Sequence, residues 1–170
     1  TYPYSLYIPN DYTPKKSWPA ILFLHGAGEG GEDGEKAAQV GIGKAVREHP
    51  DWFPCIVVFP QCRPERFWDE QMRAMALAVL DRVCRDCNVD ANRVSLTGLS
   101  LGGYGTWAFG STEGGRFSAL APICGGGDPV HAATLAAKPI WCFHGDADAV
   151  VPVSESRNMV EAVKAAGGDV

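Results

Sequence analysis

A serine stands at the centre of a glycine-framed pentapeptide, Gly98-Leu99-Ser100-Leu101-Gly102, between an apolar run and a helix-like stretch. A sharp turn from a strand into a helix exposes a serine hydroxyl, and flanking glycines avoid steric collisions there. The free N–H groups at the start of the helix favour the negative charge that develops in acyl transfer. The pentapeptide therefore predicts Ser100 as a nucleophile. The alternative is a glycine-rich start of a helix with an incidental serine.

A second glycine-rich loop, His25-Gly26-Ala27-Gly28-Glu29-Gly30-Gly31, follows the apolar run that ends at Leu24. Such a loop can direct a backbone N–H at a substrate oxygen without obstruction by side chains. Enzymes that use a serine in this setting pair one such N–H with that of the residue after the serine. We therefore predict Ala27 and Leu101 as oxyanion donors, with Gly28 as the second choice in the loop. The alternative is a phosphate-binding loop, but the glycine spacing fits neither common phosphate motif and no lysine follows.

A carboxylate is needed to orient the histidine base of a nucleophilic serine. The segment His144-Gly145-Asp146-Ala147-Asp148, which continues to Val151-Pro152, follows another apolar run downstream of Ser100. Asp148 is our predicted acid. Asp146 is its competitor and is expected to hydrogen-bond the backbone of the turn instead. Asp128 is a third candidate, for which we expect a role as a helix N-cap.

The apolar pattern predicts a single α/β domain over residues 1–170, with a mainly parallel sheet and helices on both faces. A continuous apolar run such as 20–24 is typical of a strand covered on both faces. Residues 4–9 alternate and end in proline, which suits an outer antiparallel strand. The predicted strands are 4–9, 20–24, 55–59, 93–97, 118–124 and 139–143, and the predicted helices are 35–48, 69–87, 101–109 and 154–166.

The composition narrows the classes of partner. The formal charge is −5, from 15 basic and 20 acidic residues, and no basic tract is present, so we expect no nucleic-acid partner. No apolar run approaches the ~18 residues of a membrane span, and we expect no membrane partner. The six cysteines are predicted to be free thiols, mostly buried. A zinc or redox role for Cys84 and Cys87 is the alternative for that pair.

With these motifs in this order, the chain resembles the α/β-hydrolase superfamily, near its polyhydroxybutyrate-depolymerase, feruloyl-esterase and predicted-peptidase branch. Five segments carry the resemblance: Tyr7-Ile8-Pro9, His25–Gly28, Gly98–Gly103, Pro122–Gly127 and His144–Asp148. It implies hydrolysis of a small-molecule carboxylic ester through a covalent acyl-enzyme, without metal or cofactor. It also implies Ser100 as nucleophile, Asp148 as acid, and Ala27 and Leu101 as oxyanion donors. A serine peptidase and a non-catalytic binding domain on the same fold remain alternatives.

Trp68 is a candidate for lining the acyl or alcohol pocket, with packing at the start of a helix as the alternative. The base is harder to assign, because the family's histidine lies in a loop after the strand that follows the last helix. Here the sequence ends at Gly168-Asp169-Val170, as that strand begins. We therefore expect the C-terminal strand and histidine loop to be absent from this chain and to belong to a longer enzyme. A protein that has lost catalysis and a histidine supplied by another chain are the alternatives.

The four histidines of the chain offer one substitute for that base. His25 and His144 lie in loop motifs, where we expect them to orient backbone groups, and His49 is expected to be solvated at a helix end. His131 is the candidate for a substitute base.

Overall fold

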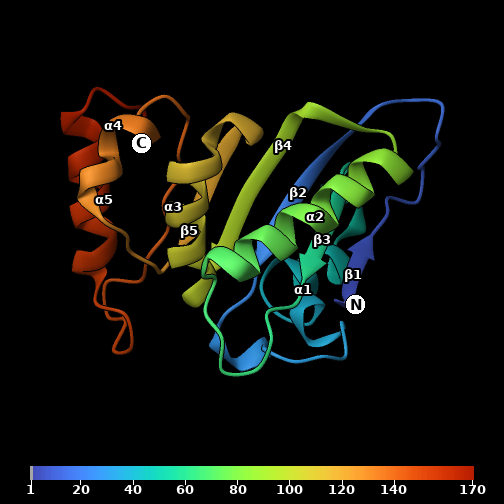
Figure 1. Ribbon diagram of the computed structural model, residues 1–170, viewed down its shortest axis with the longest axis horizontal. Helices are drawn as coiled ribbons and strands as arrows, with labels where there is room; N and C mark the ends of the chain where they lie inside the picture. The colour runs from blue at the N-terminus through green and yellow to red at the C-terminus, as the bar shows by residue number, and fades with distance from the viewer. Residues whose placement is uncertain (1) are drawn as a thin grey trace.

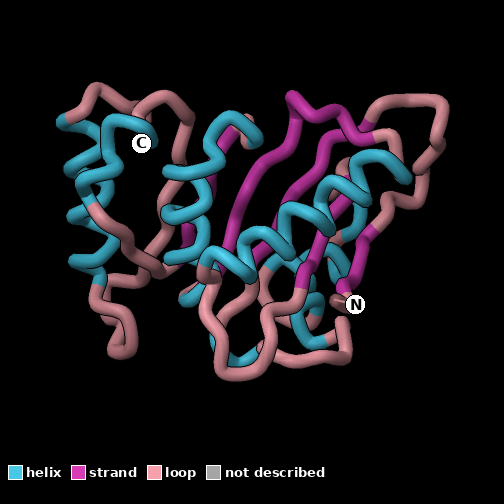
Figure 2. Tube along the Cα trace, in the orientation of Figure 1, coloured by secondary structure: helices cyan, strands magenta, loops and turns pink. Residues whose placement is uncertain are grey.

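The computed structural model describes residues 2–170, in which five strands form one sheet in the order β1-β3-β2-β4-β5 (Figures 1 and 2). β1 runs antiparallel to β3, and the other neighbouring pairs are parallel. The predicted mainly parallel sheet with an outer antiparallel strand is therefore confirmed. The strands are β1 (Tyr4–Tyr7), β2 (Trp18–Leu24), β3 (Ile56–Pro60), β4 (Val89–Leu99) and β5 (Ala119–Ile123).

Helices cover both faces of this sheet, as predicted. Alternate strand residues point to opposite faces, so Leu22 and Val58 pack into the core under α2 and α3. Their neighbours Phe23 and Val57 pack with Val46 of α1 on the other face. In Figure 1, α2 and α3 lie in front of the sheet, and α4 and α5 lie beyond β5. The helices are α1 (Ile42–Glu48), α2 (Glu70–Asp86), α3 (Leu101–Glu113), α4 (Ala132–Leu135) and α5 (Val153–Ala165).

The helix α2 follows its sequence pattern closely. Its N-cap is Asp69, whose carboxylate accepts a hydrogen bond of 3.0 Å from the N–H of Met72. Side chains at spacings of three and four form its buried face: Met72, Met75, Ala76, Val79, Leu80 and Val83. Such spacing places side chains on one side of a helix, so α2 contributes a continuous stripe to the core.

The predicted helix 35–48 is wrong over its first half. The chain forms a 3₁₀ helix at Lys36–Ala38, and α1 begins only at Ile42. Gly41 separates the two with a φ of 53°, which only glycine adopts readily. A Cβ there would lie 2.9 Å from the ring of Phe23, so the break brings the backbone against the sheet.

The predicted strand 139–143 forms only in part. Ile140 and Phe143 make isolated parallel bridges to Leu120 and Ile123 of β5. Pro122 lies between these bridges and has no N–H, so the ladder lacks the bond that this position would donate. The segment still runs beside β5, and its Ile140 N–H donates to the carbonyl oxygen of Asp169.

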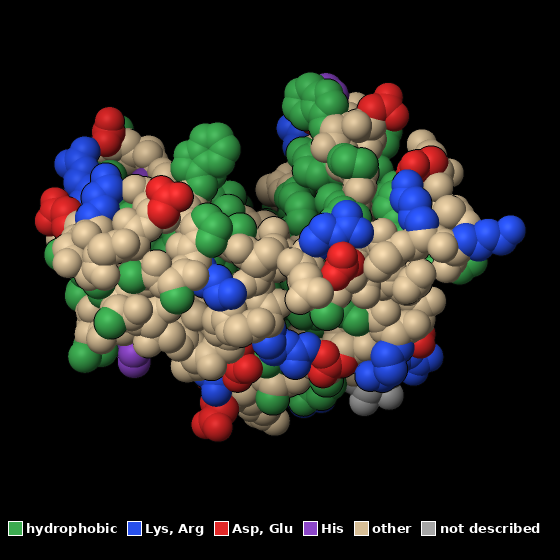
Figure 3. Space-filling model, turned by 90° about the horizontal axis from the view of Figure 1, so that it is seen from above, with side chains coloured by type: hydrophobic (Ala, Val, Ile, Leu, Met, Phe, Trp, Pro, Cys, Tyr) green, Lys and Arg blue, Asp and Glu red, His purple; other side chains and the backbone are tan. Residues whose placement is uncertain are grey.

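The sheet face opposite α2 and α3 is hollowed between α1 and segment 139–143. The concavity has a volume of about 620 Å³ and an apolar lining that includes Phe23, Trp141 and Phe143. Figure 3 shows a hollow between two groups of hydrophobic side chains. Among residues 2–170, no helix combines the length and the apolar character needed to cross a bilayer.

Candidate functional site

Ser100 occupies the tight turn between β4 and α3. Its backbone has φ 55° and ψ −113°, a region that non-glycine residues rarely adopt. Its N–H donates to the carbonyl oxygen of Ile123 at 2.9 Å, and its carbonyl oxygen accepts from Tyr104 N–H at 3.1 Å. Strain of this kind persists only where the surroundings impose it, and it clusters at functional sites.

Two glycines allow the turn to approach β2. A Cβ on Gly102 would lie 1.8 Å from the carbonyl oxygen of Leu24, and one on Gly98 would lie 2.2 Å from that of Gly102. Both positions therefore exclude any side chain. The start of α3 packs directly on the end of β2, which sets the position of Ser100 beside the loop that follows β2.

That loop contains the predicted donors Ala27 and Gly28. It forms a short 3₁₀ helix at Ala27–Glu29, and both residues are exposed. A Cβ on Gly26 would lie 3.8 Å from the Cβ of Ser100, so the loop and the serine are neighbours. Ala27 and Leu101 each begin a helix, where the first N–H groups have no acceptor within the helix.

His25 holds this loop from within the core. Its Nε2 accepts a hydrogen bond of 2.9 Å from the N–H of Cys62, so the proton of the neutral ring is on Nδ1 and is donated to the carbonyl oxygen of Gly26. Burial lowers the pKa of His25 and keeps it neutral. Both ring nitrogens are occupied by backbone groups, which is the orienting role expected for this residue.

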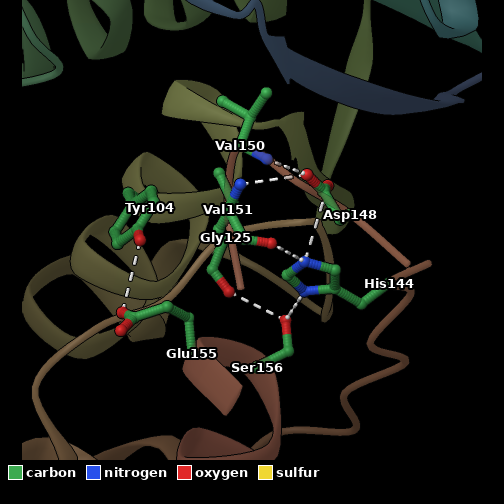
Figure 4. Close-up of polar contacts among 8 residues, drawn as sticks. All are labelled: Tyr104, Gly125, His144, Asp148, Val150, Val151, Glu155 and Ser156. Carbon is green, nitrogen blue, oxygen red and sulfur yellow. Dashed lines mark hydrogen bonds and ion pairs between the residues drawn. The ribbon is translucent and has the colours of Figure 1, made fainter. Parts of the chain in front are cut away.

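Asp148 lies in the loop between segment 139–143 and α5 (Figure 4). One carboxylate oxygen accepts from the N–H groups of Val150 and Val151, both at 2.9 Å. These two hydrogen bonds, that from Val151 first, lower the pKa of Asp148 and keep it ionised. The second oxygen is 3.6 Å from Nε2 of His144 and accepts no hydrogen bond within residues 2–170.

His144 braces the same loop. Its Nε2 donates to the carbonyl oxygen of Val151 at 2.8 Å, and its Nδ1 lies 2.7 Å from the hydroxyl of Ser156. Ser156 also reaches the carbonyl oxygen of Gly125, which ties α5 to the segment after β5 (Figure 4). Both nitrogens of the His144 ring therefore have a partner, a backbone carbonyl oxygen at Nε2 and a side-chain hydroxyl at Nδ1.

The remaining two histidines lie on the surface. His49 stacks on Trp52 with ring centroids 4.0 Å apart, and His131 ends an exposed 3₁₀ helix at Pro129–His131. Within residues 2–170, Ser100 Oγ makes no hydrogen bond to a histidine.

Asp146 and Asp128, the other two candidate acids, bind other groups. Asp146 pairs with Arg157 of α5 at 2.9 Å and is exposed. The expectation that Asp146 hydrogen-bonds the turn is wrong, because Asp148 receives both N–H groups of that turn. Asp128 accepts from the N–H of Val130 at 3.0 Å and caps the 3₁₀ helix at Pro129–His131, as expected of an N-cap.

Cys124 lies near both predicted catalytic residues, Ser100 and Asp148, and we did not predict this from the sequence. Burial raises the pKa of its thiol, while the N–H of Ser100 lowers it and the carboxylate of Asp148 raises it. Its own φ is 41°, which marks a second strained residue beside Ser100. The signal was present, because Cys124 follows β5 and the carboxyl ends of neighbouring parallel strands meet at one edge.

Trp68 is buried, with 6% of its surface exposed. Its indole N–H donates to the carbonyl oxygen of His25 at 3.0 Å, and its ring packs edge-on against Phe109. It therefore packs at the start of α2, the alternative we gave, and it also borders a shallow surface groove that Leu101 lines.

The six cysteines are free thiols, as predicted, but the expectation that most are buried is wrong, because only Cys55 and Cys62 are buried and the other four are partly exposed. Burial raises the pKa values of Cys84 and Cys87, which disfavours the reactive thiolate in both. Among residues 2–170, no three His, Cys, Asp or Glu side chains are arranged to hold a metal ion.

Comparison with solved structures places the fold among hydrolases. A thermostable esterase shares 35% identity with a TM-score of 0.88, over 97% of this chain and 48% of the esterase. A mutant feruloyl esterase module from Clostridium thermocellum, complexed with sinapinate, shares 19% identity with a TM-score of 0.73, over 94% and 67% of the two chains. An acylaminoacyl peptidase from Pyrococcus horikoshii shares 17% identity with a TM-score of 0.67, over 91% and 32%.

The chain thus spans about half the length of the thermostable esterase. No curated protein sequence matches it significantly. The profile of the dienelactone hydrolase family matches residues 50–170, which is more than half of the chain and includes Ser100 and Asp148. By this match and the fold, the chain belongs to the dienelactone hydrolase family of the α/β-hydrolase superfamily.

Proposed function

We propose that the protein is a serine esterase that cleaves small carboxylic esters through a covalent acyl-enzyme at Ser100. The observation that carries this proposal is the strained backbone of Ser100 at the start of α3, with its Cβ 3.8 Å from where a Cβ on Gly26, in the loop after β2, would lie. In this proposal, the hydroxyl lies at the carboxyl edge of the sheet, between the first N–H groups of the 3₁₀ helix Ala27–Glu29 and those of α3.

In the proposed reaction, Ser100 Oγ attacks the ester carbonyl and its proton passes to a histidine. The N–H groups of Ala27 and Leu101 stabilise the oxyanion. Collapse of the tetrahedral intermediate expels the alcohol, which takes the proton from the histidine. Water then attacks the acyl-enzyme with the same histidine as base, and the carboxylic acid is released.

Asp148 is the proposed partner of that histidine. It stays ionised because two backbone N–H groups bind one of its oxygens, and its second oxygen can accept from an imidazole N–H. Of the histidines in this chain, His25 and His144 bind other groups, and His49 and His131 lie on the surface. We therefore propose that the base comes from a part of the enzyme outside these 170 residues. The base is essential for a high rate, because removing it from another serine hydrolase lowers kcat by about 10⁶-fold.

A substrate panel on the full-length protein tests the reaction class. We expect hydrolysis of p-nitrophenyl esters to exceed that of aminoacyl p-nitroanilides, and Ser100→Ala to lower the esterase rate by at least about 10³. Ser111→Ala, at a partly exposed serine near the far end of α3, is the matched control and should retain the rate. Preference for the amides would instead assign a peptidase, and no Ser100-dependent turnover of either class would indicate a non-catalytic domain.

A further inference from the structure

A buried glutamine, Gln61, contacts the loop that carries the proposed oxyanion donor Ala27. Gln61 directly follows β3, which neighbours β2 in the sheet, so it lies beside the loop that follows β2. Only 1% of its surface is exposed. A glutamine is rarely buried to this extent unless its amide is hydrogen-bonded, so its polar atoms need partners within the protein.

The amide of Gln61 bonds three residues of this loop. Its Nε2 donates to the carbonyl oxygen of Glu29 at 3.0 Å and to Oδ1 of Asp33 at 3.2 Å. Its Oε1 accepts from the N–H of Gly34 at 2.6 Å. A carbonyl oxygen can only accept and a backbone N–H can only donate, so these partners fix the orientation of the amide. One side chain thus holds three positions along residues 29–34.

Together with its neighbour Cys62, Gln61 holds both ends of the short 3₁₀ helix in this loop. The N–H of Cys62 donates to Nε2 of His25, before the helix, and its carbonyl oxygen accepts from the N–H of Gly31 at 2.9 Å, after the helix. The bond from Gln61 to Glu29 adds the last residue of the helix itself. The helix is therefore fixed on both sides of the proposed donor.

Gln61 is the part of this arrangement that depends on a side chain after β3. Cys62 acts through backbone atoms, which any residue except proline would supply. If the amide of Gln61 is removed, the buried N–H of Gly34 loses its acceptor and the carbonyl oxygen of Glu29 loses its donor. Because an unpaired buried polar group is unfavourable, the loop has to shift until water or another group replaces the amide.

We propose that Gln61 is a positioning residue that holds the N–H of Ala27 in place for the oxyanion. The inference rests on the proposed esterase function, because the oxyanion forms only if Ser100 attacks an ester. Oxyanion donors act through preorganised geometry. A displacement of about 1 Å in an active site can lower the rate about 10²-fold.

Steady-state kinetics of the full-length protein with p-nitrophenyl acetate test this role. Gln61→Leu removes all three bonds, whereas Gln61→Glu keeps an acceptor for the N–H of Gly34 and removes the donor to Glu29. We expect both variants to lower kcat about 10- to 100-fold with KM within about 2-fold of wild type, because acylation and deacylation both pass through an oxyanion. Gly31→Ala should lower kcat in the same way, since its Cβ would lie 2.5 Å from Nε2 of Gln61.

Two control variants separate positioning from stability. Gln71→Leu makes the same change at an exposed glutamine of α2 and should leave kcat unchanged. Leu135→Ala removes a buried side chain from α4, which lies beyond β5 and away from the loop after β2 (Figure 1). This truncation destabilises the fold. Measured well below its unfolding temperature, it should retain the kcat of the wild type.

The outcomes separate this inference from the proposed function. An unchanged kcat in Gln61→Leu and Gln61→Glu overturns the role of Gln61 and leaves the esterase intact. An equal loss in Leu135→Ala also overturns that role, since the effect would then follow stability alone. If Gln61→Leu does not fold, Gln61→Glu and Gly31→Ala decide. A wild type without Ser100-dependent turnover overturns the esterase proposal and, with it, the role of Gln61.

Discussion

The strained turn at Ser100 depends on contacts that single residues provide. A non-glycine residue in such a conformation costs of the order of 1–3 kcal/mol, which the surrounding packing has to offset. Gly102 and Gly98 offset it by letting α3 start in direct contact with the end of β2. The packing of the surrounding residues therefore holds the serine in this conformation, rather than hydrogen bonds of its own side chain.

We predict that Gly102→Ala destabilises the protein by about 3 kcal/mol, since its Cβ would lie 1.8 Å from the backbone oxygen of Leu24. Denaturant unfolding measures the change. Gly114→Ala, at a helical position with no atom within 4 Å of the new Cβ, is the control and should be neutral or slightly stabilising. Equal stability of the two variants would show that α3 does not pack on β2 in this way.

Asp148 predicts a pH dependence of stability. Backbone N–H groups lower its pKa in the folded protein, so its ionised form stabilises the fold above pH ~4, and this contribution is lost as the pH falls. The difference in unfolding free energy between wild type and Asp148→Asn should therefore shrink from pH 7 to pH 3. Asp146→Asn removes one charge from the same loop without losing a backbone bond, and it should show a smaller change. A constant difference for Asp148→Asn would contradict the assignment.

At the scale of elements, a side-chain cap marks the start of α2. The carboxylate of Asp69 accepts from the N–H of Met72 and pairs with Arg66, and these bonds lower its pKa. Trp68 lies directly before this cap, with its indole N–H bonded to the carbonyl oxygen of His25 and its ring packed against Phe109.

Asp69→Ala should destabilise the protein by about 1 kcal/mol, whereas Asp69→Asn should cost less because asparagine caps helices as well. Thermal or denaturant unfolding compares the two. If both variants lose the same stability, the contribution comes from the ion pair with Arg66 and not from the cap.

The sequence predicted those elements whose signal is local and repeated. Apolar runs located β2, β3 and β5, and spacings of three and four located α2, because such patterns follow directly from burial. It did not predict the break at Gly41, which depends on the approach of Phe23 from a distant strand. Nor did it predict the interrupted strand 139–143, whose cause is the missing N–H of Pro122 in its neighbour.

The site shows the same division. The positions of Ser100 and of the loop after β2 could be predicted, because their glycine-rich motifs reflect requirements of the backbone. The N–H groups of the turn bind Asp148 and not Asp146, which pairs instead with Arg157 of α5, a contact that no local pattern reveals. The position of Cys124 near Ser100 and within the electrostatic influence of Asp148 depends on the order of the strands.

For the whole molecule, the core lies between the sheet and the pair α2 and α3, while the opposite face is open over β4 and β5. Trp107 of α3 is 1% exposed, and Trp141 on the open face is 72% exposed. The two tryptophans therefore report on the two sides of the sheet.

Trp107→Ala should cost about 3–5 kcal/mol, as other buried aromatic truncations do. Trp141→Ala should change the stability by less than about 0.5 kcal/mol, since most of its ring is already in water. Urea unfolding of both variants measures the contrast. A large loss on Trp141→Ala would mean that the open face is covered in solution.

The most direct test of the central claim is the site of covalent labelling by a fluorophosphonate, mapped by mass spectrometry in the full-length protein. The account predicts a single modified residue, Ser100, with labelling abolished in Ser100→Ala and retained in Ser111→Ala. Asp148→Asn should slow the labelling, because the histidine would lose the charge that orients it. Labelling at another residue, or labelling that persists in Ser100→Ala, would contradict Ser100 as the nucleophile.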